Sequence, residues 1–477
     1  MKASIREQLR RRKRHTAARL RQMNLEHYGQ PVLQASNIQY EIAERNKGIS
    51  AGGIGAIHLM VQKLGLPGII NQKVPLLKLN LPYTESDHVL NIAYNLLAGG
   101  TRMEHIENRR QDEVFLDALG AQRIPDPTTA RDFCQRFDEA SVLALMEAIN
   151  EVRLKVWAQQ PEAFFEEAVL DADGTIAATT GECKQGMERT YDGQWGFHPL
   201  VLSLSNTHEP LYLVNRSGNR PSHEDAYLYY DRAIALCRRA GFRRITLRGD
   251  TDFSQTTHLD RWDKDTVEFI FGYDAQPNLV ALAERLPAEA WKKLERPRPE
   301  PAARPRQRPE NVKQDLVEAH EYETLRTEEE FVAEFPYRPT ACKRAYRMVV
   351  TRKRVSVHRG QQYLLDKTPM YFHITNKTEP TAEQIVLAPQ GSDGRCNHEN
   401  DLDQLKNGVR AMDMPTNNLV SNGAYMVMAS LAWTLKVWFG LLLPEGGPWA
   451  ERRQAEKHKV QCLEFRSFLD ALILLPC

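Results

Sequence analysis

Apolar positions between residues 50 and 158 recur three and four residues apart, which is the spacing of one face of a helix. The segment SDHVLNIAYNLLAGG shows this pattern, with Ser86 as a candidate N-cap and two glycines at its end. The segment PDPTTARDFCQRFDEASVLALMEAINEV continues the pattern after a Pro-Asp-Pro turn. The sequence therefore predicts an all-helical region over residues 49–160.

The pattern changes near residue 160 to short apolar runs that are typical of strands. AFFEEAVLDADGT is an apolar run that ends in acidic residues, and HPLVLSLSN and LYLVNRSGN alternate like two antiparallel strands. The amphipathic helix SHEDAYLYYDRAIALCRRAG separates them from two further strands, RRITLRGD and VEFIFGYD. This order predicts an α/β fold with a mixed sheet and helices packed on it.

A β-rich segment with an irregular loop is predicted next, over residues 276–365. The stretch RPRPEPAARPRQRPE favours an extended loop, because proline disrupts both helices and central strands. AYRMVVTRKRVSV and QQYLLDKTPMYFHITN then read as strands. The first of them carries Arg352, Lys353 and Arg354, which we expect to line a phosphate-binding surface.

The most apolar tract of the chain, residues 423–444, has nearly the length of a membrane span. It carries Lys436 near its middle, so we expect a buried core helix and no membrane partner. The N-terminus is charged and has no apolar signal segment, and the seven cysteines are scattered without a CxxC pair. These features favour a cytoplasmic protein without a disulfide framework.

The chain has almost no net charge, but its N-terminal segment is strongly basic. Lys and Arg number 63 against 62 Asp and Glu, so the net charge of +1 gives no overall attraction to nucleic acid. The opening MKASIREQLRRRKRHTAARLRQ is strongly basic. We interpret residues 1–48 as an arm that grips phosphates, and a solvated helical tail is an equal alternative.

Carboxylates stand at the ends of two predicted strands and on a later helix. Asp171 and Asp173 end the first strand and, being two apart, share one face, while Asp250 ends the strand RRITLRGD. Glu399 lies four residues after Arg395 and seven before Lys406, so an α-helix would place the three on one stripe. Any one of these acids alone is most simply a capping or surface residue. Together they predict a site for Mg²⁺ or Mn²⁺, because hard cations offset the repulsion between gathered carboxylates.

Four motifs in this order resemble those of a known family. DADGT with YDGQWGFHPL is similar to its first-strand motif and hairpin, RSGNRPSHEDA to the loop before the next helix, and RGDTDFS to its second-aspartate motif. MYFHITN followed by R-x3-E-x6-K is similar to its last strand and signature helix. On these motifs the chain, from about residue 50 to 445, resembles the DDE transposases of bacterial insertion sequences. The branch is the one with the signature Y-x2-R-x3-E-x6-K, and Ser392 stands at its tyrosine position.

The resemblance implies the fold and the domain organisation. It implies a ribonuclease H-like catalytic core, that is, a mixed five-stranded sheet with flanking helices, interrupted by a β-rich insertion and preceded by an all-helical N-terminal domain. The expected division is a basic arm (1–48), a helical DNA-binding or DNA-associated domain (49–160), the core (161–275 and 366–445), the insertion (276–365) and a C-terminal tail (446–477).

The resemblance also implies what each site residue does. Asp173, Asp250 and Glu399 would hold a pair of divalent ions. Asp173 is preferred to Asp171, because the first aspartate of the family is typically followed by a small residue and then Thr or Ser. Arg395 and Lys406 would contact phosphates beside the scissile bond.

The activity implied is that of a transposase acting on double-stranded DNA. It would bind terminal inverted repeats, cleave beside them and join the freed 3′-hydroxyls to target DNA. We expect a homodimer on DNA, in the nucleoid of a bacterium. A catalytically silent DNA-binding descendant and a metal-free glycosidase with paired carboxylates are the alternatives.

Four aromatic side chains near predicted strand ends, Tyr191, Trp195, His198 and Trp262, invite assignment to base stacking or proton transfer. Such residues more often belong to the core or its rim, so we interpret them as packing residues. We do not assign His198 as a general base, because a metal-bound hydroxide would not need one.

Overall fold

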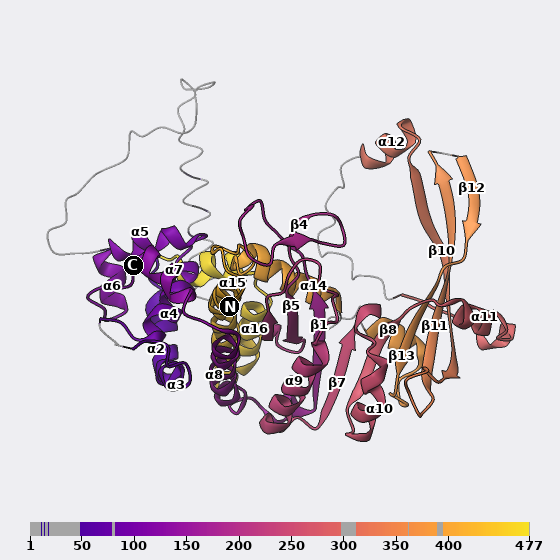
Figure 1. The fold of residues 1–477 in the computed structure, drawn as a ribbon, viewed down its shortest axis with the longest axis horizontal. Helices are drawn as coiled ribbons and strands as arrows, with labels where there is room; N and C mark the ends of the chain where they lie inside the picture. The colour runs from indigo at the N-terminus through magenta and orange to yellow at the C-terminus, as the bar shows by residue number, and fades with distance from the viewer. Residues whose placement is uncertain are drawn as a thin grey trace.

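The structure is a computed structural model that describes residues 48–78, 82–296, 312–360, 362–388 and 395–476, together with the isolated positions 11, 14 and 18 (Figure 1). The remainder of the predicted basic arm and nearly all of the Pro/Arg-rich loop lie outside these residues. Ser392 and the side chain of Arg395 also lie outside them, so the predicted roles of these two positions stay predictions.

The predicted all-helical region is confirmed as a group of packed helices (Figure 1). Helix α4 begins after Thr84, whose backbone N–H donates to the Asp87 carboxylate at 2.8 Å. The expectation that Ser86 is the N-cap is wrong, because Thr84 has the extended backbone of a cap whereas Ser86 lies within the helix. The helices of this region are α2 (Ile54–Leu64), α3 (Leu66–Lys73), α4 (Glu85–Leu97), α5 (Ile106–Arg110), α6 (Glu113–Ala118), α7 (Pro127–Cys134) and α8 (Glu139–Trp157).

Five strands form the predicted ribonuclease H-like core, in the order β6-β5-β1-β7-β8. The first three pair antiparallel through hairpins, whereas β7 and β8 run parallel to β1. Parallel neighbours need crossover connections, which α9 (Ala226–Ala240) and α10 (Thr256–Lys264) provide. The strands are β1 (Glu167–Gly174), β5 (Leu200–Leu204), β6 (Glu209–Val214), β7 (Arg244–Gly249) and β8 (Glu268–Tyr273).

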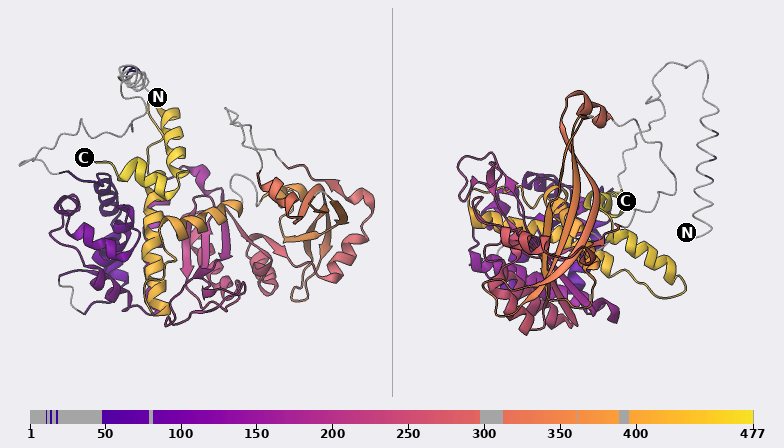
Figure 2. Two further views of the ribbon diagram at one scale, coloured as in Figure 1. Left: turned by 90° about the horizontal axis from the view of Figure 1, so that it is seen from above. Right: turned by 90° about the vertical axis from the view of Figure 1, so that its right-hand side faces the viewer.

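The strands of the β-rich segment extend the core sheet instead of forming a second sheet. Strand β13 pairs antiparallel with β8 and with β11, so the sheet continues through β13-β11-β10-β9, and β12 pairs with β11. The hairpin of β10 and β11 is long and projects from the body, with α12 (Val312–Ala319) near its end (Figure 2). These strands are β9 (Lys292–Lys293), β10 (Glu323–Tyr337), β11 (Tyr346–Arg359), β12 (Gln362–Lys367) and β13 (Met370–Thr375).

Helix α15 (Leu419–Leu441) is the core helix predicted from the most apolar tract. Of the described helices it alone is long and apolar enough to cross a membrane, and 94% of its most apolar window is buried inside the protein. The Lys436 ammonium lies 4.3 Å from the Trp433 ring centroid and donates to the Gln461 carbonyl at 2.7 Å. Burial lowers the pKa of Lys436 to about 8. The prediction of a buried helix is therefore confirmed.

A fully buried carboxylate, Glu209, joins the helical region to the sheet and to α15. It accepts hydrogen bonds from Arg153 Nε on α8 at 2.9 Å and from the indole N–H groups of Trp157 and Trp438 at 2.9 and 2.8 Å. Thr207 Oγ1 donates a fourth bond at 2.6 Å. Because a buried carboxylate is stable only when its lone pairs are satisfied, these four donors fix how the three elements meet.

The C-terminal residues return to the start of the helical region. The backbone N–H groups of Gly52 and Gly53 donate to the carbonyls of Leu475 and Ile473 at 3.0 and 3.1 Å. A Cβ atom on Gly53 would lie 2.0 Å from the Leu472 carbonyl oxygen, so glycine is needed for this close approach. The remaining helices are α11 (Pro277–Glu284), α13 (Ala382–Leu387), α14 (Arg395–Asp403), α16 (Ala450–Gln461) and α17 (Phe465–Phe468).

Candidate active site

The parallel pairing of β1 with β7 leads, at the carboxyl ends of both strands, to two of the predicted acids. Asp171 on β1 lies opposite Arg248 on β7 in parallel pairing. Two residues further along each strand stand Asp173 and Asp250, and neighbouring strands lie about 4.8 Å apart. Both acids are half-buried, at the carboxyl edge of the sheet. This edge is the usual place for a ligand in an open sheet with parallel strands.

Asp250 is held at the junction between β7 and a short 3-10 helix, η4 (Thr251–Phe253). Its Oδ1 accepts a hydrogen bond from the Asp252 backbone N–H at 3.0 Å. It also lines a cavity of about 360 Å³ between the ends of β7 and β8 and strand β13. The backbone bond orients one carboxylate oxygen, and the cavity leaves room beside the strand ends.

Asp171, the alternative first acid, is engaged in a buried ion pair. Arg248 donates from Nε and Nη2 to its two carboxylate oxygens, each at 2.7 Å, and Nη2 also donates to Ser205 Oγ at 2.9 Å. Asp171 is 2% exposed. A bidentate guanidinium occupies the lone pairs that a metal would need, so the geometry favours Asp173 as the ligand.

His198 packs behind the first acid. A Cβ atom on Gly174, the residue after Asp173, would lie 2.8 Å from His198 Nε2, so the ring requires a glycine there. His198 Nδ1 lies 2.8 Å from the Arg220 carbonyl oxygen, and the imidazole is buried. Burial lowers the pKa of His198, against the opposing effects of the Arg220 carbonyl, Asp173 and Asp252. A neutral ring agrees with its interpretation as a packing residue.

The helix that carries Glu399 departs from a regular α-helical period. Helix α14 ends at Asp403 and continues as a π-helical turn over Gln404–Gly408. A π turn holds more residues than an α turn, so the offset from Glu399 to Lys406 differs from that of a regular α-helix. Lys406 is half-buried and Glu399 is exposed. The shared stripe of Glu399 and Lys406 therefore stays a prediction.

Lys406 is drawn toward the first acid. Burial lowers its pKa, while the negative charges of Asp403 and Asp173 act in the opposite direction. The effect of Asp173 indicates that the ammonium lies within electrostatic reach of the candidate acids. Asp401 anchors the same helix, since its Oδ2 lies 3.1 Å from His208 Nδ1 in the turn between β5 and β6.

Metal coordination by three acids is not formed in the described part of the chain. No group of three or more His, Cys, Asp or Glu side chains among the described residues is arranged to hold a metal ion. The neighbouring Asp173 and Asp250 offer the hard oxygen donors that Mg²⁺ and Mn²⁺ prefer. Glu399 is not grouped with them, so its role as a third ligand stays a prediction.

The basic strand predicted to bind phosphates is paired with acidic residues of its own hairpin. Lys353 Nζ lies 3.8 Å from Glu330 Oε1, and Arg354 lies 3.9 Å from Glu329 and 3.4 Å from Asp366. These pairs arise because TEEEF on β10 runs antiparallel to TRKRV on β11, a match visible in the sequence that our prediction did not use.

Arg352, the remaining predicted phosphate-binding residue of this strand, contacts two aromatic rings. The Arg352 guanidinium carbon lies 4.1 Å from the Trp291 ring centroid and 5.6 Å from that of Phe331. This arrangement holds the side chain through cation–π contacts, and no ion pair of Arg352 is found within the described part of the chain. Arg352 is therefore better placed than Lys353 or Arg354 to attract a phosphate.

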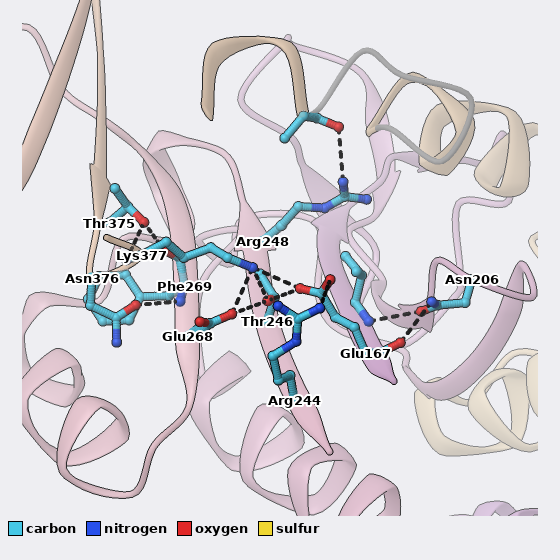
Figure 3. Close-up of polar contacts among 12 residues, drawn as sticks. Glu167, Asn206, Arg244, Thr246, Arg248, Glu268, Phe269, Thr375, Asn376 and Lys377 are labelled. Carbon is cyan, nitrogen blue, oxygen red and sulfur yellow. Dashed lines mark hydrogen bonds and ion pairs between the residues drawn. The ribbon is translucent and has the colours of Figure 1, made fainter. Parts of the chain in front are cut away.

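A polar cluster that sequence reasoning missed lies at the opposite, amino-terminal edge of the parallel strands. Lys377, after β13, donates to Glu167 at 2.8 Å, to Glu268 at 2.7 Å and to Thr246 Oγ1 at 2.8 Å (Figure 3). Asn376 accepts from the Phe269 N–H at 2.9 Å (Figure 3). The cluster connects β1, β7, β8 and β13. The sequence feature that could have predicted it is the polar pair Asn-Lys directly after an apolar strand.

Comparisons with known proteins identify the family of the chain. A family model described as "Transposase DDE domain group 1" matches residues 40–462, so the chain belongs to the DDE transposase family. Among solved structures, the chain is similar to the cryo-EM structure of the piggyBac transposase synaptic complex with hairpin DNA. The TM-score is 0.39 and the identity 11%, over 88% of this chain and 81% of that one. No curated protein matches the chain.

Proposed function

We propose that this protein binds the terminal inverted repeats of its own element, cleaves phosphodiester bonds beside them and transfers the 3′-hydroxyl strands to target DNA. One observation carries the proposal. The parallel strands β1 and β7 end near Asp173 and Asp250, at the carboxyl edge of a ribonuclease H-like sheet, in a chain of the DDE transposase family. These are the two strand-borne acids that the proposed chemistry requires.

The roles of the acids follow from donor chemistry. Asp173 and Asp250, joined by Glu399, would hold Mg²⁺ or Mn²⁺, and we propose two ions. When bound, the ions would lower the pKa of a water or a 3′-hydroxyl and stabilise the leaving oxygen. The residues of the chain position the reactants. The bond between Asp250 and the Asp252 N–H orients one carboxylate, and the buried pair of Asp171 and Arg248 fixes the two strands that carry the acids.

The cationic residues supply the contacts to DNA. We propose that Lys406, close to Asp173, and Arg395 contact phosphates flanking the scissile bond. Arg352, Lys353 and Arg354 on the projecting hairpin would contact DNA further from the cut. Lys353 and Arg354 must then exchange their acidic partners for phosphates, whereas Arg352 need not.

The biological setting is part of the same proposal. We infer an element of the bacterial insertion-sequence type, in the branch with the Y-x2-R-x3-E-x6-K signature, acting in the cytoplasm on the nucleoid. The partners would be the two ends of the element and the target DNA, bound by a homodimer. The predicted division into arm, helical domain, core, insertion and tail is retained, with the insertion continuing the core sheet.

The test uses DNA fragments that carry the flanks of the gene. Purified protein is incubated with them in Mg²⁺, in Mn²⁺ and in EDTA, and strand breaks are mapped on sequencing gels. We expect cleavage at the element boundary in either metal and none in EDTA. Asp173→Asn, Asp250→Asn and Glu399→Gln should each lower the cleavage rate at least about 100-fold while retaining DNA binding.

Each alternative predicts a different result of the same experiment. Tight binding of the boundary fragment without cleavage in either metal would favour a catalytically silent DNA-binding protein. Cleavage that persists in EDTA, or that survives Asp250→Asn at the wild-type rate, would contradict the proposed metal site. Glu451→Gln, an exposed acid on α16, is the control and should cleave normally.

A further inference from the structure

Two aromatic side chains stand exposed on a small hairpin at the edge of the candidate active site. Tyr191 is 82% exposed and Trp195 is 55% exposed. The hairpin comprises β3 (Glu188–Arg189) and β4 (Trp195–Phe197), and β4 also pairs with β2 (Ala177–Ala178) to form a separate three-stranded sheet. Exposing two large rings costs hydrophobic free energy, so their place near the site calls for a functional explanation.

The turn that carries Tyr191 is rigid. The Thr190 N–H donates to the Gln194 carbonyl at 2.8 Å, and the Gly193 N–H donates to the Thr190 carbonyl at 2.9 Å. Gly193 has φ 86°, a conformation that suits glycine. Asp192 Oδ1 accepts from Thr190 Oγ1 and from the Gln194 N–H, at 2.5 and 3.2 Å. These bonds fix the backbone from which the Tyr191 side chain extends.

The base of the hairpin is fixed to the core in the same way. The Gly218 N–H donates to the Gly186 carbonyl at 3.4 Å, and the Gln185 N–H donates to the Asn417 carbonyl at 2.8 Å. A Cβ atom on Gly218 would lie 2.4 Å from the Gly196 carbonyl oxygen, so the hairpin packs closely on the loop after β6. The exposed rings are therefore held at a set position relative to β1.

The His198 side chain lies between Tyr191 and the segment that carries Asp173. The Tyr191 ring centroid lies 5.7 Å from that of His198, at an interplanar angle of 55°. His198 in turn packs against Gly174, the residue after Asp173. An exposed, rigidly held ring therefore stands beside the place where the scissile phosphate would bind.

We propose that Tyr191, assisted by Trp195, is a stacking platform for a nucleobase next to the scissile phosphate. The inference rests on the proposed function and adds a residue that positions the substrate. A ring held on a rigid turn loses little entropy when a base stacks on it, and every base offers a π face, so the contact would not depend on sequence. Arg189 lies near the same turn, since a Cβ atom on Gly193 would be 3.5 Å from its Nη2, and it can meet the neighbouring phosphate.

The test measures base stacking apart from cleavage. Boundary DNA carrying 2-aminopurine at one position at a time is bound in Ca²⁺, and the fluorescence change on binding is recorded for wild type, Tyr191→Ala, Tyr191→Phe and Trp449→Ala. Trp449 is a matched control, an exposed aromatic before α16. We expect wild type, Tyr191→Phe and the control to show a change at one or two positions beside the cut, and Tyr191→Ala to lose it.

Cleavage in Mg²⁺ provides the second measurement. Tyr191→Ala should slow cleavage about tenfold or more. An abasic site at the responsive position should slow wild type by a similar factor and Tyr191→Ala no further. Additive losses, an unchanged fluorescence signal in Tyr191→Ala, or a Tyr191→Phe variant as slow as Tyr191→Ala would overturn the inference. If wild type does not cleave at all, the proposed function fails. If wild type cleaves but shows no 2-aminopurine response, only the inference that Tyr191 stacks on a base is contradicted.

Discussion

Arg248 on β7 grips Asp171 on β1 through two hydrogen bonds of 2.7 Å each, one step inward from the candidate acids Asp173 and Asp250. Both partners are buried. The ion pair thus fixes the register of β1 and β7, and the next residues on the same face are the candidate acids. It also distinguishes Asp171 from Asp173, which the sequence alone does not.

This pair predicts opposite phenotypes for two neighbouring aspartates. Asp171→Ala leaves a buried guanidinium without its counter-charge, so it should lower the free energy of unfolding by about 3–5 kcal/mol. Asp173→Ala should leave the stability within about 1 kcal/mol and abolish DNA cleavage. Denaturant unfolding and the cleavage assay, applied to both variants, check this. A stable Asp171→Ala protein that cannot cleave DNA would instead identify Asp171 as the metal ligand.

A double variant provides the control for the pair. Asp171→Leu combined with Arg248→Met removes both charges together, so it should be more stable than Asp171→Ala alone. A double variant less stable than the single one would show that the charges contribute through other partners, such as the Ser205 hydroxyl.

The succession of strands and helices along the core was predictable because each core strand is a short apolar run between polar turns, and the acids end those runs. What could not be predicted depends on contacts between distant segments. The pairing of Asp171 with Arg248 requires knowledge of the register, and the π turn over Gln404–Gly408 interrupts a regular helix period. The sequence shows opposite charges on two strands, but the ion pairs of Lys353 and Arg354 follow only when those strands are known to pair.

The buried carboxylate Glu209 is expected to be critical for stability. Glu209→Gln removes the charge that faces Arg153 and replaces an acceptor with a donor, so the free energy of unfolding should fall by about 3 kcal/mol or more. Glu166→Gln, which removes an exposed partner of Arg243, should change it by less than about 1 kcal/mol. Equal effects of the two variants, measured by denaturant unfolding, would show that the four hydrogen bonds to Glu209 do not join the elements as described.

The acidic residues of β10 should weaken DNA binding by competing for the basic strand. Glu329→Gln with Glu330→Gln removes the β10 partners of Lys353 and Arg354, while Asp366 still pairs with Arg354. Affinity should therefore rise, and the slope of log K against log salt should steepen by up to about 1. Fluorescence anisotropy over a salt series measures both quantities. Glu456→Gln, which pairs with Arg452 on α16, is the control. An unchanged slope would show that this strand does not contact phosphates.

The helical region should lose stability in mild acid because of His88. Its ring stacks on Phe133 at 4.3 Å, and burial lowers its pKa to about 4. In the unfolded chain the pKa is about 6.5, so the unfolded state binds a proton first as the pH falls. Stability should therefore decrease from about pH 6.5 towards pH 4, by about 2 kcal/mol at pH 5.

The variant His88→Phe isolates this effect. It cannot take up a proton, so its stability should change less than that of wild type between pH 7 and pH 5. Thermal unfolding followed by circular dichroism at both pH values gives the comparison. If the two proteins lose stability in parallel, the acid sensitivity belongs to other groups.

The central claim is that three carboxylates from distant parts of the chain meet around divalent ions when DNA is bound. The most direct measurement is a structure of the protein with boundary DNA and Mn²⁺, with the ions located by their anomalous scattering. We predict manganese within about 2.2 Å of oxygens of Asp173, Asp250 and Glu399, beside the scissile phosphate. A DNA complex with Glu399 remote from the two aspartates, or with manganese bound by other residues, would contradict the account.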